Sequence, residues 1–342
     1  MVLLNDSDSS RLISRIKDVA GFILKPPVEL ITDTEDFIRI SRGQVIELEG
    51  RQFVVSGYVY EPRFGLEDQP KFWVRRGYDL ETGQTVIIKF EFYEEFVARF
   101  GSFQIPCYRS PEKESEVLNL VKNDPRFMHG YTLLDSSGNN VRIIEYINGK
   151  SLYTTILDLD VDHEYYYHTY LIHFMHKLID SLEGLQMLHE NDLCHGDIRN
   201  DHILIEDRTN QFRWIDFDLN QDVMFDPYET YAIFDVWSTG RLLQFVVGMG
   251  LVTFHDIQSS NTFSSDTISK LQPGDASAFH YYRLMNLKKI YPYISEPLNN
   301  ILMRFSMSAD DYYWSMSDLI RDLYEAIVYI PKSDVDPFKN RC

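Results

Sequence analysis

Two aspartates, nineteen residues apart, lie in segments whose pattern suits chemistry on phosphate groups. Asp197 lies in Cys194–Ile205 (CHGDIRNDHILI), and Asp216 lies in Trp214–Asp218 (WIDFD). A hydrophobic strand that ends in an acid, beside a loop that carries another acid, is typical of metal-assisted phosphoryl transfer. One carboxylate would orient the attacking hydroxyl, and the other would hold Mg²⁺, because hard cations prefer oxygen ligands. Either aspartate alone would more often be a helix-cap or turn residue. It is the occurrence of both aspartates at this spacing that indicates a phosphoryl-transfer site.

The first half of the chain supplies strands to position these residues. Short β-branched and aromatic runs, separated by turns that contain glycine, predict an antiparallel meander. A helix is expected at 111–122, and an amphipathic helix at 11–24 precedes the strands. The expected strands are 45–48, 52–60, 71–78, 84–92, 128–134 and 141–147.

The second half is mostly helical. Apolar periodicity predicts long helices at 163–190 and 231–250, and helices again from residue 278 onward. The stretch 256–278 is rich in Ser, Thr, Asp and Gly, which predicts a loop or insertion at about 255–278.

The predicted fold is therefore α+β and bilobal. A small antiparallel β-sheet lobe with one main helix precedes a large, mainly helical lobe. The expected boundaries are an N-terminal extension at 1–44, a small lobe at 45–147 and a large lobe at 148–342, and the join suggests a cleft.

Charge and composition exclude several classes of function. The chain has 33 Lys and Arg against 52 Asp and Glu, a net charge of −19. So acidic a surface repels phosphate backbones, which argues against a nucleic-acid binder or a protein that binds anionic membranes. The longest apolar run, 242–254, is interrupted by Gln244 and is too short to span a bilayer. Three scattered cysteines, Cys107, Cys194 and Cys342, predict no disulfide framework, and we expect a reducing, cytoplasmic setting.

The sequence resembles the protein-kinase-like superfamily over about residues 45 to 330. Besides the two aspartate segments, four more stretches fit the family in the correct order. They are 82–89 (TGQTVIIK, the lysine strand), 114–118 (ESEVL, the glutamate helix), 143–149 (IIEYING, the hinge) and 235–240 (DVWSTG, the helix that anchors the catalytic loop). Residues 182–189 resemble the helix that leads into that loop.

The resemblance implies a nucleotide site in the small lobe. Lys89 would orient the α- and β-phosphates of ATP, and Glu114 would hold the lysine, with Glu116 as the less favoured candidate. Backbone groups of Glu145 and Ile147 would meet the adenine.

The same resemblance implies the reacting groups of the large lobe. Asp197 would accept the proton of the substrate hydroxyl, and Arg199 would balance charge on the transferring group. Asp216, with Asp218 or His202, would bind Mg²⁺ or Mn²⁺.

Some motifs depart from the family pattern. The candidate phosphate-binding loop contains only two widely spaced glycines, Gly57 and Gly65, and an ordinary hairpin is the alternative interpretation. His202 stands where the family has a metal-binding asparagine. Its imidazole suits Mn²⁺ or Zn²⁺ better than Mg²⁺, and a structural role is equally open. Asp218 replaces the glycine of the metal-binding triplet and adds a carboxylate.

Further departures remove the parts of a phosphorylation switch. Gly196 stands in the position of the arginine that reads a loop phosphate. Only about twenty residues separate Asp216 from Asp235, with Thr230 as the one Ser/Thr hydroxyl between them. Tyr313 replaces an arginine that forms a buried ion pair in the family. We therefore expect no regulation by activation-loop phosphorylation.

Three functions compete at this point. The first is an active ATP-dependent phosphotransferase of the Ser/Thr protein kinase type, which acts on a protein acceptor. The second is a pseudokinase that binds nucleotide or serves as a scaffold, which His202 and the weak glycine loop favour. The third is a small-molecule kinase, because the His-Gly-Asp and Ile-Asp-Phe-Asp combination is closer to aminoglycoside and choline kinases.

The segment that connects the lysine strand to the glutamate helix is rich in aromatic residues. Residues 91–111, between the lysine strand and the glutamate helix, contain six aromatic side chains. They either pack over the small lobe or form a surface for a partner.

Overall fold

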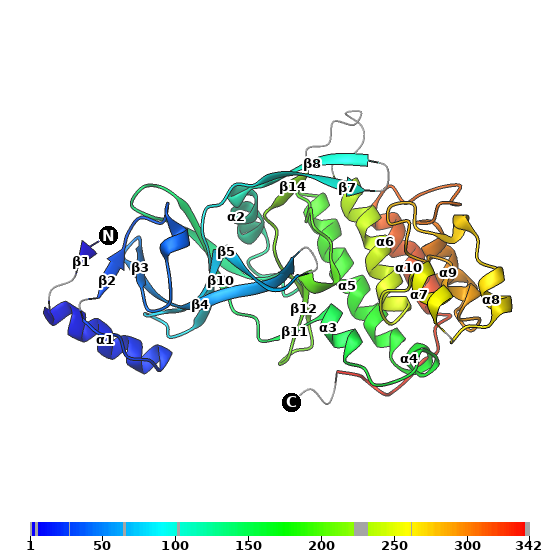
Figure 1. The fold of residues 1–342 in the computed structure, drawn as a ribbon, viewed down its shortest axis with the longest axis horizontal. Coiled ribbons are helices and arrows are strands. Elements are labelled where there is room, and N and C mark those ends of the chain that lie inside the picture. The colour runs from blue at the N-terminus through cyan, green and yellow to red at the C-terminus, as the bar shows by residue number, and fades with distance from the viewer. Residues whose placement is uncertain are drawn as a thin grey trace. The chain divides into compact units, whose positions relative to one another are not determined.

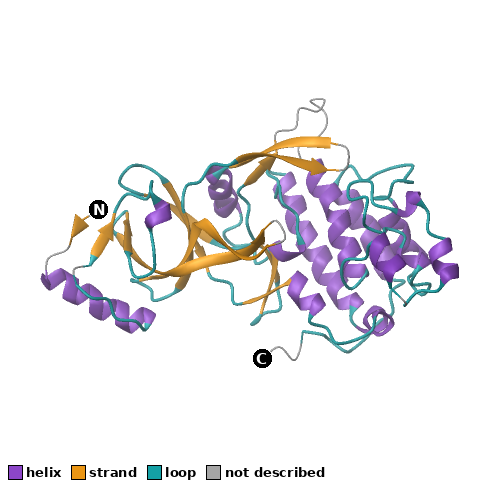
Figure 2. Cartoon of the chain, viewed as in Figure 1, coloured by secondary structure: helices purple, strands orange, loops and turns teal. Residues whose placement is uncertain are grey.

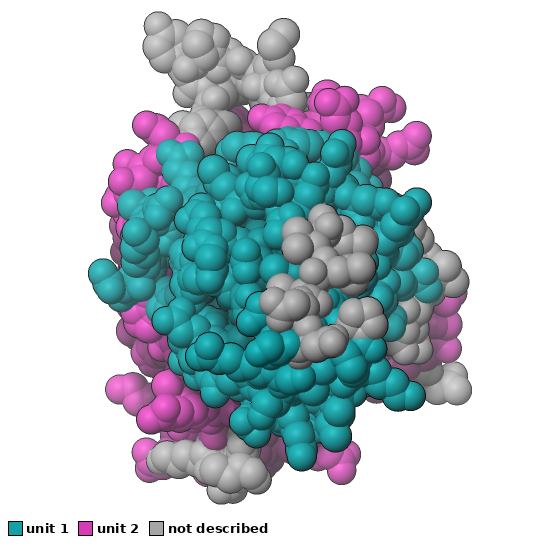
Figure 3. Space-filling view, turned by 90° about the vertical axis from the view of Figure 1, so that its left-hand side faces the viewer, with its two compact units in different colours: residues 1–94, 109–123, 128–147 teal, residues 95–108, 124–127, 148–342 magenta. Residues whose placement is uncertain are grey.

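The structure, a computed structural model, describes residues 2–3, 6–26, 28–63, 66–100, 103–221, 232–260 and 262–338. The chain divides into two compact units, which Figure 3 colours separately. Unit 1 comprises residues 1–94, 109–123 and 128–147, and unit 2 comprises residues 95–108, 124–127 and 148–342. Each unit is described by itself.

Unit 1 is built on an eight-stranded sheet with the order β1-β2-β3-β4-β5-β6-β10-β9. Neighbouring strands are antiparallel except β2 and β3, which run parallel. The strands are β1 Val2–Leu3, β2 Glu29–Ile31, β3 Val45–Leu48, β4 Arg51–Arg63, β5 Leu66–Asp79, β6 Thr85–Lys89, β9 Gly130–Leu134 and β10 Asn140–Glu145. The helices are α1 Asp6–Ala20, the short 3₁₀ turn η1 Phe37–Arg39 and α2 Pro111–Leu120.

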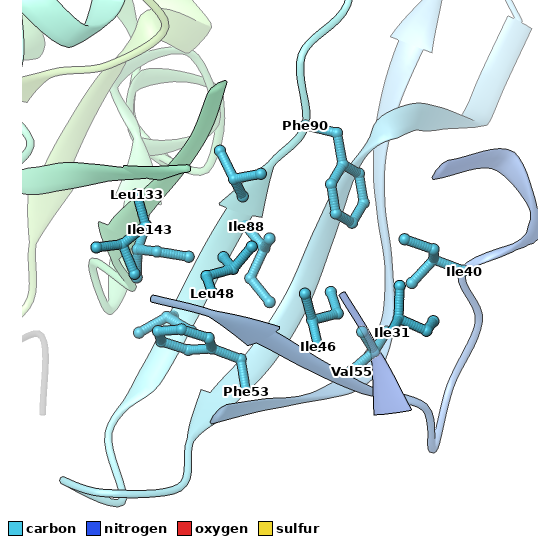
Figure 4. Packing of buried hydrophobic residues seen from close by; sticks show 12 residues of the cluster. Ile31, Ile40, Ile46, Leu48, Phe53, Val55, Ile88, Phe90, Leu133 and Ile143 are labelled. Carbon is cyan, nitrogen blue, oxygen red and sulfur yellow. The ribbon is translucent and has the colours of Figure 1, made fainter. Parts of the chain in front are cut away.

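Apolar side chains that alternate along these strands form the core of unit 1 (Figure 4). Ile46, Leu48, Phe53, Val55 and Ile88 are among the buried members of one cluster. The amphipathic helix α1 packs a second set of buried residues, which includes Leu12 and Ile16, against Val45 and Val54. The turn that leads into β6 depends on Gly83, which has φ +78° and donates its amide to the Asp79 carbonyl at 2.8 Å. A side chain is strained in that left-handed region, so glycine is favoured there.

Unit 2 is mainly helical (Figure 2). Its longest helix, α5, and the almost completely buried α6 carry much of its core. The helices are α3 Leu152–Leu157, α4 His163–Thr169, α5 Leu171–His189, α6 Ile233–Val247, α7 Phe254–Ser259, α8 Ser265–Ser269, α9 Glu296–Met303 and α10 Met316–Ile327, with 3₁₀ turns η2 Asn200–His202, η3 Pro273–Asp275 and η4 Leu287–Lys289.

Two small sheets complete unit 2. One has the order β11-β12-β13, and the other has the order β14-β8-β7. The strands are β7 Glu95–Phe100, β8 Phe103–Arg109, β11 Gly149–Ser151, β12 Ile203–Glu206, β13 Phe212–Trp214 and β14 Leu219–Gln221.

The α+β class, with a β-rich and a helical part, is confirmed. Two local expectations are corrected. The helix expected at 163–190 is two helices, because α4 is held at Tyr166, whose hydroxyl donates to the Val246 carbonyl (2.7 Å), and at Tyr167, whose hydroxyl accepts from the Ser295 amide (2.8 Å).

The Ser- and Thr-rich stretch expected as a loop at 256–278 contains α8 and most of α7. Thr253 and Ser264 cap these helices by accepting hydrogen bonds from the amides of Asp256 and Thr267. Small hydroxyl residues favour helix N-caps as well as loops, so composition alone gave the wrong element here.

None of the helices within the described ranges combines the length and the apolar character that crossing a membrane requires.

Candidate active site

Unit 1 contains a buried ion pair between the predicted lysine and glutamate. Lys89 ends β6, and its Nζ lies 2.7 Å from Glu114 Oε1. The two side chains are only 5% and 0% exposed. Helix α2 presents Glu114 because Ser110 caps it, accepting from the Lys113 amide, and Pro111 fits its first turn. The predicted pair is confirmed.

A second cation shares the carboxylate of Glu114, and sequence reasoning missed it. Arg142 lies directly opposite Lys89 in the pairing of β10 with β6, and its Nε is 3.2 Å from Glu114 Oε2. Its Nη1 donates to the Asn140 carbonyl at 3.0 Å. These three ionisable side chains are buried and together carry one excess positive charge. The sequence feature that could have identified Arg142 is the presence of a charged residue within the otherwise apolar stretch 141–144 (VRII).

The predicted hinge residues follow this arginine. The Glu145 amide donates to the His129 carbonyl at 2.9 Å, and the Glu145 carboxylate accepts from the His129 amide at 2.7 Å. Ile147 is 7% exposed. The adenine contacts expected of Glu145 and Ile147 stay predictions.

The candidate glycine loop lies on a long hairpin. Gly57 pairs with Arg76 within β4 and β5, and the register shifts on both sides of it. Phe64 and Gly65, the other half of the motif, lie outside the described residues. The part of this segment that the structure describes consists of two antiparallel strands with register shifts, and its contact with phosphates stays a prediction.

In unit 2, Asp235 on α6 fixes the backbone that precedes Asp197. Its carboxylate accepts from the amides of His195 (2.6 Å) and Gly196 (2.9 Å), and His189 Nε2 lies 3.0 Å away. Burial alone would raise the pKa of the Asp235 carboxyl, but the histidines and the Gly196 amide outweigh it and lower that pKa. Gly196 has φ +86°, a conformation that favours glycine over the arginine of the family pattern.

Two of the predicted functional side chains, Asp197 and Asp216, lie close to a third, His202. Its Nδ1 is 3.7 Å from Asp197 Oδ2, and its Nε2 is 3.6 Å from Asp216 Oδ2. Asp216 has φ +71°, a strained conformation for a non-glycine residue and one that occurs preferentially at functional sites. Asp218, two residues further on, is 2% exposed.

The hydrogen bond of His202 decides which nitrogen can bind a cation. Nδ1 lies 2.9 Å from the Asp197 carbonyl oxygen, which has no proton to give, so Nδ1 carries the proton. In the neutral imidazole, the lone pair of Nε2 then faces the Asp216 carboxylate. His202 and Asp216 would be the residues that hold a divalent cation, and its charge would relieve the repulsion between these two electron-rich groups.

These residues fit a cation that accepts nitrogen as well as oxygen ligands. Across the described residues, no group of three or more His, Cys, Asp and Glu side chains could hold a metal ion. A cation that serves phosphoryl transfer often has only one or two protein ligands and completes its shell with water and substrate phosphates. Asp216 and His202 would be two such ligands.

Two arginines lie near Asp197. Arg199 makes a double contact with Asp201, with Nε–Oδ1 and Nη2–Oδ2 distances of 3.0 and 2.5 Å, and its Nη1 is 3.8 Å from Asp197 Oδ2. Arg241 on α6 also lies 3.8 Å from Asp197, at Oδ1, and its Nε donates to the Ile198 carbonyl at 2.9 Å. Sequence reasoning identified Arg199 but missed Arg241, which lies one residue beyond the last motif.

Unit 1 thus contains the expected contact of Lys89 with Glu114, and unit 2 brings Asp197 and Asp216 to His202. The fold is α+β, with one β-rich unit and one mainly helical unit. No family model and no curated protein matches the sequence.

Solved structures similar to the chain are protein kinases. The PK-1 kinase of Cydia pomonella granulovirus is 14% identical, with 73% of this chain and 88% of that chain covered and a TM-score of 0.47. Titin kinase with its flanking domains is 14% identical, with 96% and 55% covered and a TM-score of 0.48. The PknI kinase domain of Mycobacterium tuberculosis is 11% identical, with 84% and 99% covered and a TM-score of 0.47. Because these TM-scores are below 0.5, the account of the site rests on the chain's own residues.

Proposed function

We propose that the chain is an ATP-dependent phosphotransferase of the Ser/Thr protein kinase type that needs no activation-loop phosphorylation. The observation that carries the proposal is the meeting of Asp197 and Asp216 at the buried imidazole of His202. The buried pair of Lys89 and Glu114 supports it, because a scaffold has no need of that pair.

The proposed roles follow from the contacts. Lys89, held by the carboxylate of Glu114 that Arg142 also contacts, binds the phosphates of ATP. Asp197 accepts the proton of the acceptor hydroxyl. The nearby guanidinium groups of Arg199 and Arg241 balance the negative charge on the transferring phosphoryl group. Asp216 and His202 hold Mg²⁺ or Mn²⁺, which neutralises charge on the phosphates when bound.

Two alternatives keep specific support. Among the residues that the structure describes, the candidate metal site has only two protein ligands, Asp216 and His202, and one of them is a histidine, which favours a nucleotide-binding pseudokinase. The His-Gly-Asp motif favours a kinase that acts on small alcohols, in the manner of aminoglycoside and choline kinases.

ATP turnover by the full chain with Mg²⁺ or Mn²⁺ tests the proposal. We expect transfer to Ser or Thr of a protein acceptor. Asp216→Asn should remove both metal-dependent nucleotide binding and transfer, whereas Asp197→Asn should retain binding and lose transfer. Transfer only to small alcohols would favour the third function, and nucleotide binding with no transfer would favour the pseudokinase.

Phosphatase treatment tests the regulatory part of the proposal. Gly196 has no side chain to bind a loop phosphate, so treated and untreated enzyme should have equal rates. A rate that disappears on dephosphorylation would contradict the proposal.

A further inference from the structure

The connector between the lysine strand and the glutamate helix is a β-hairpin. Strands β7 and β8 pair from Glu95 opposite Tyr108 to Phe100 opposite Phe103. Although β6 and α2, on either side of it in sequence, belong to unit 1, residues 95–108 belong to unit 2. There β8 is the middle strand of the sheet β14-β8-β7 (Figure 1). A distant insertion thus supplies main-chain pairing to β14, which begins directly after Asp218.

Strand β8 of the hairpin has one buried side. Along β8, Ile105 and Cys107 are 5% and 2% exposed, whereas Gln104, Pro106 and Tyr108 are exposed. This alternation shows that β8 is anchored by side chains as well as by its backbone. Burial raises the pKa of the Cys107 thiol, in agreement with its place on this buried side of β8.

Strand β14 in turn contacts the catalytic loop. Gln221, its last residue, donates from Nε2 to the Gly196 carbonyl at 2.8 Å. The Gly196 amide donates to Asp235 Oδ1 at 2.9 Å. Gly196 is therefore held from both sides, by β14 at its carbonyl and by α6 at its amide. The held carbonyl belongs to the peptide bond that leads into Asp197.

From these contacts we infer that the hairpin of β7 and β8 acts through β14 and Gln221 to position Asp197. Main-chain pairing with the insertion orders the segment after the metal-binding aspartates. In kinases with a phosphorylation switch, a phosphate that recruits arginine orders that segment. Gln221 is a positioning residue, since it touches the loop and none of the reacting atoms. The inference rests on the proposed function for its effect on catalysis, but the ordering itself does not require activity.

The first test changes only the Gln221 contact. Gln221→Met keeps the size of the side chain and removes the donor, and Gln104→Met, at an exposed position of β8, is the matched control. We expect kcat for transfer to fall about 10- to 100-fold in Gln221→Met, because small misplacements of reacting groups have large effects. ATP affinity and the melting temperature should stay close to those of the wild type. An unchanged kcat, or an equal loss in Gln104→Met, would overturn the role of Gln221.

The second test needs no activity. Residues 95–108 are replaced by a Gly/Ser linker of equal length, and amide hydrogen exchange is measured at Leu219–Gln221 and at Gly196 and Asp197. We expect faster exchange at both places, with unchanged exchange along α9 and α10 as evidence that unit 2 remains folded. Gln221→Met should speed exchange at Gly196 and Asp197 alone. Unchanged exchange in both variants would overturn the inference, whereas faster exchange in a chain without transfer activity would contradict only the proposed function.

Discussion

At the scale of single residues, the candidate site differs most from its expected form at Glu114. Its carboxylate receives two buried cations, Lys89 at 2.7 Å and Arg142 at 3.2 Å. Removing the shared anion would leave both cations uncompensated, whereas removing one cation leaves a paired carboxylate. The three residues should therefore contribute unequally to stability.

We predict that Glu114→Gln lowers the free energy of unfolding by about 3–5 kcal/mol, in the range for breaking a buried ion pair. Lys89→Met should lower it by only about 1 kcal/mol, because Arg142 still balances Glu114. Urea unfolding of both variants measures the difference. An equal loss of stability in both would mean that Arg142 does not share the charge. Lys89→Met should nevertheless bind ATP much more weakly.

The choice of metal depends on His202. Because the imidazole offers nitrogen where an amide would offer oxygen, His202→Asn should shift the preference of transfer from Mn²⁺ toward Mg²⁺. The ratio of rates with the two metals is the measurement, and His255→Asn, an exposed change on α7, is the control. A loss of activity with both metals would instead give the histidine a dedicated role.

At the scale of elements, helix α6 holds the catalytic loop through Asp235 and Arg241. Its Gly240 packs against Phe305, and a Cβ on this glycine would lie 2.5 Å from two carbons of the ring. Phe305 is itself 1% exposed and has little room to move. The close approach of α6 to Phe305 thus requires glycine.

Gly240→Ala should destabilise the fold by about 1–2 kcal/mol, because overpacking exceeds the gain in helix propensity. Thermal unfolding measures the effect. Gly57→Ala is the matched control for stability, since its added Cβ would meet no atom within 4 Å. If Gly240→Ala were as stable as the wild type, α6 would not be constrained by this contact.

At the scale of the whole molecule, two partly buried histidines link stability to pH. Burial lowers the pKa of His163 to about 4. Burial, with Arg241 and Arg283 nearby, lowers the pKa of His280 to about 3. The unfolded chain binds these protons near the ordinary value of about 6.5, so the stability they contribute is present above that pH and is lost as the pH falls toward 3–4.

We therefore expect the free energy of unfolding to decrease by about 2–4 kcal/mol between pH 7.5 and 5.0. Urea unfolding at the two pH values measures this change. In His163→Gln the decrease should be smaller, and in His255→Asn, whose side chain is 88% exposed, it should equal that of the wild type. Stability that rises on acidification would contradict the buried, neutral state of both histidines.

The sequence by itself determined the chemical groups and the local elements that carry them. Asp197 and Asp216 could be identified from their spacing beside short apolar segments, whereas Lys89 and Glu114 were identified through the resemblance to the protein-kinase-like superfamily. The strand and the helix that carry Lys89 and Glu114 could be read from local patterns. Such patterns reflect the periodicity of strands and helices, which depends on neighbouring residues only. The α+β class followed from the same information.

Only the tertiary structure decided which distant groups share one environment. It placed Arg142 beside Glu114, Arg241 beside Asp197 and the insertion hairpin beside β14. It also divided the helix expected at 163–190, through bonds from α4 to Val246 and Ser295. The first three share a physical reason. Strand pairing and buried ion pairs bring together residues that are far apart in sequence. The local periodicity of the sequence does not specify which residue will pair with a buried cation or which strand will pair with a free sheet edge.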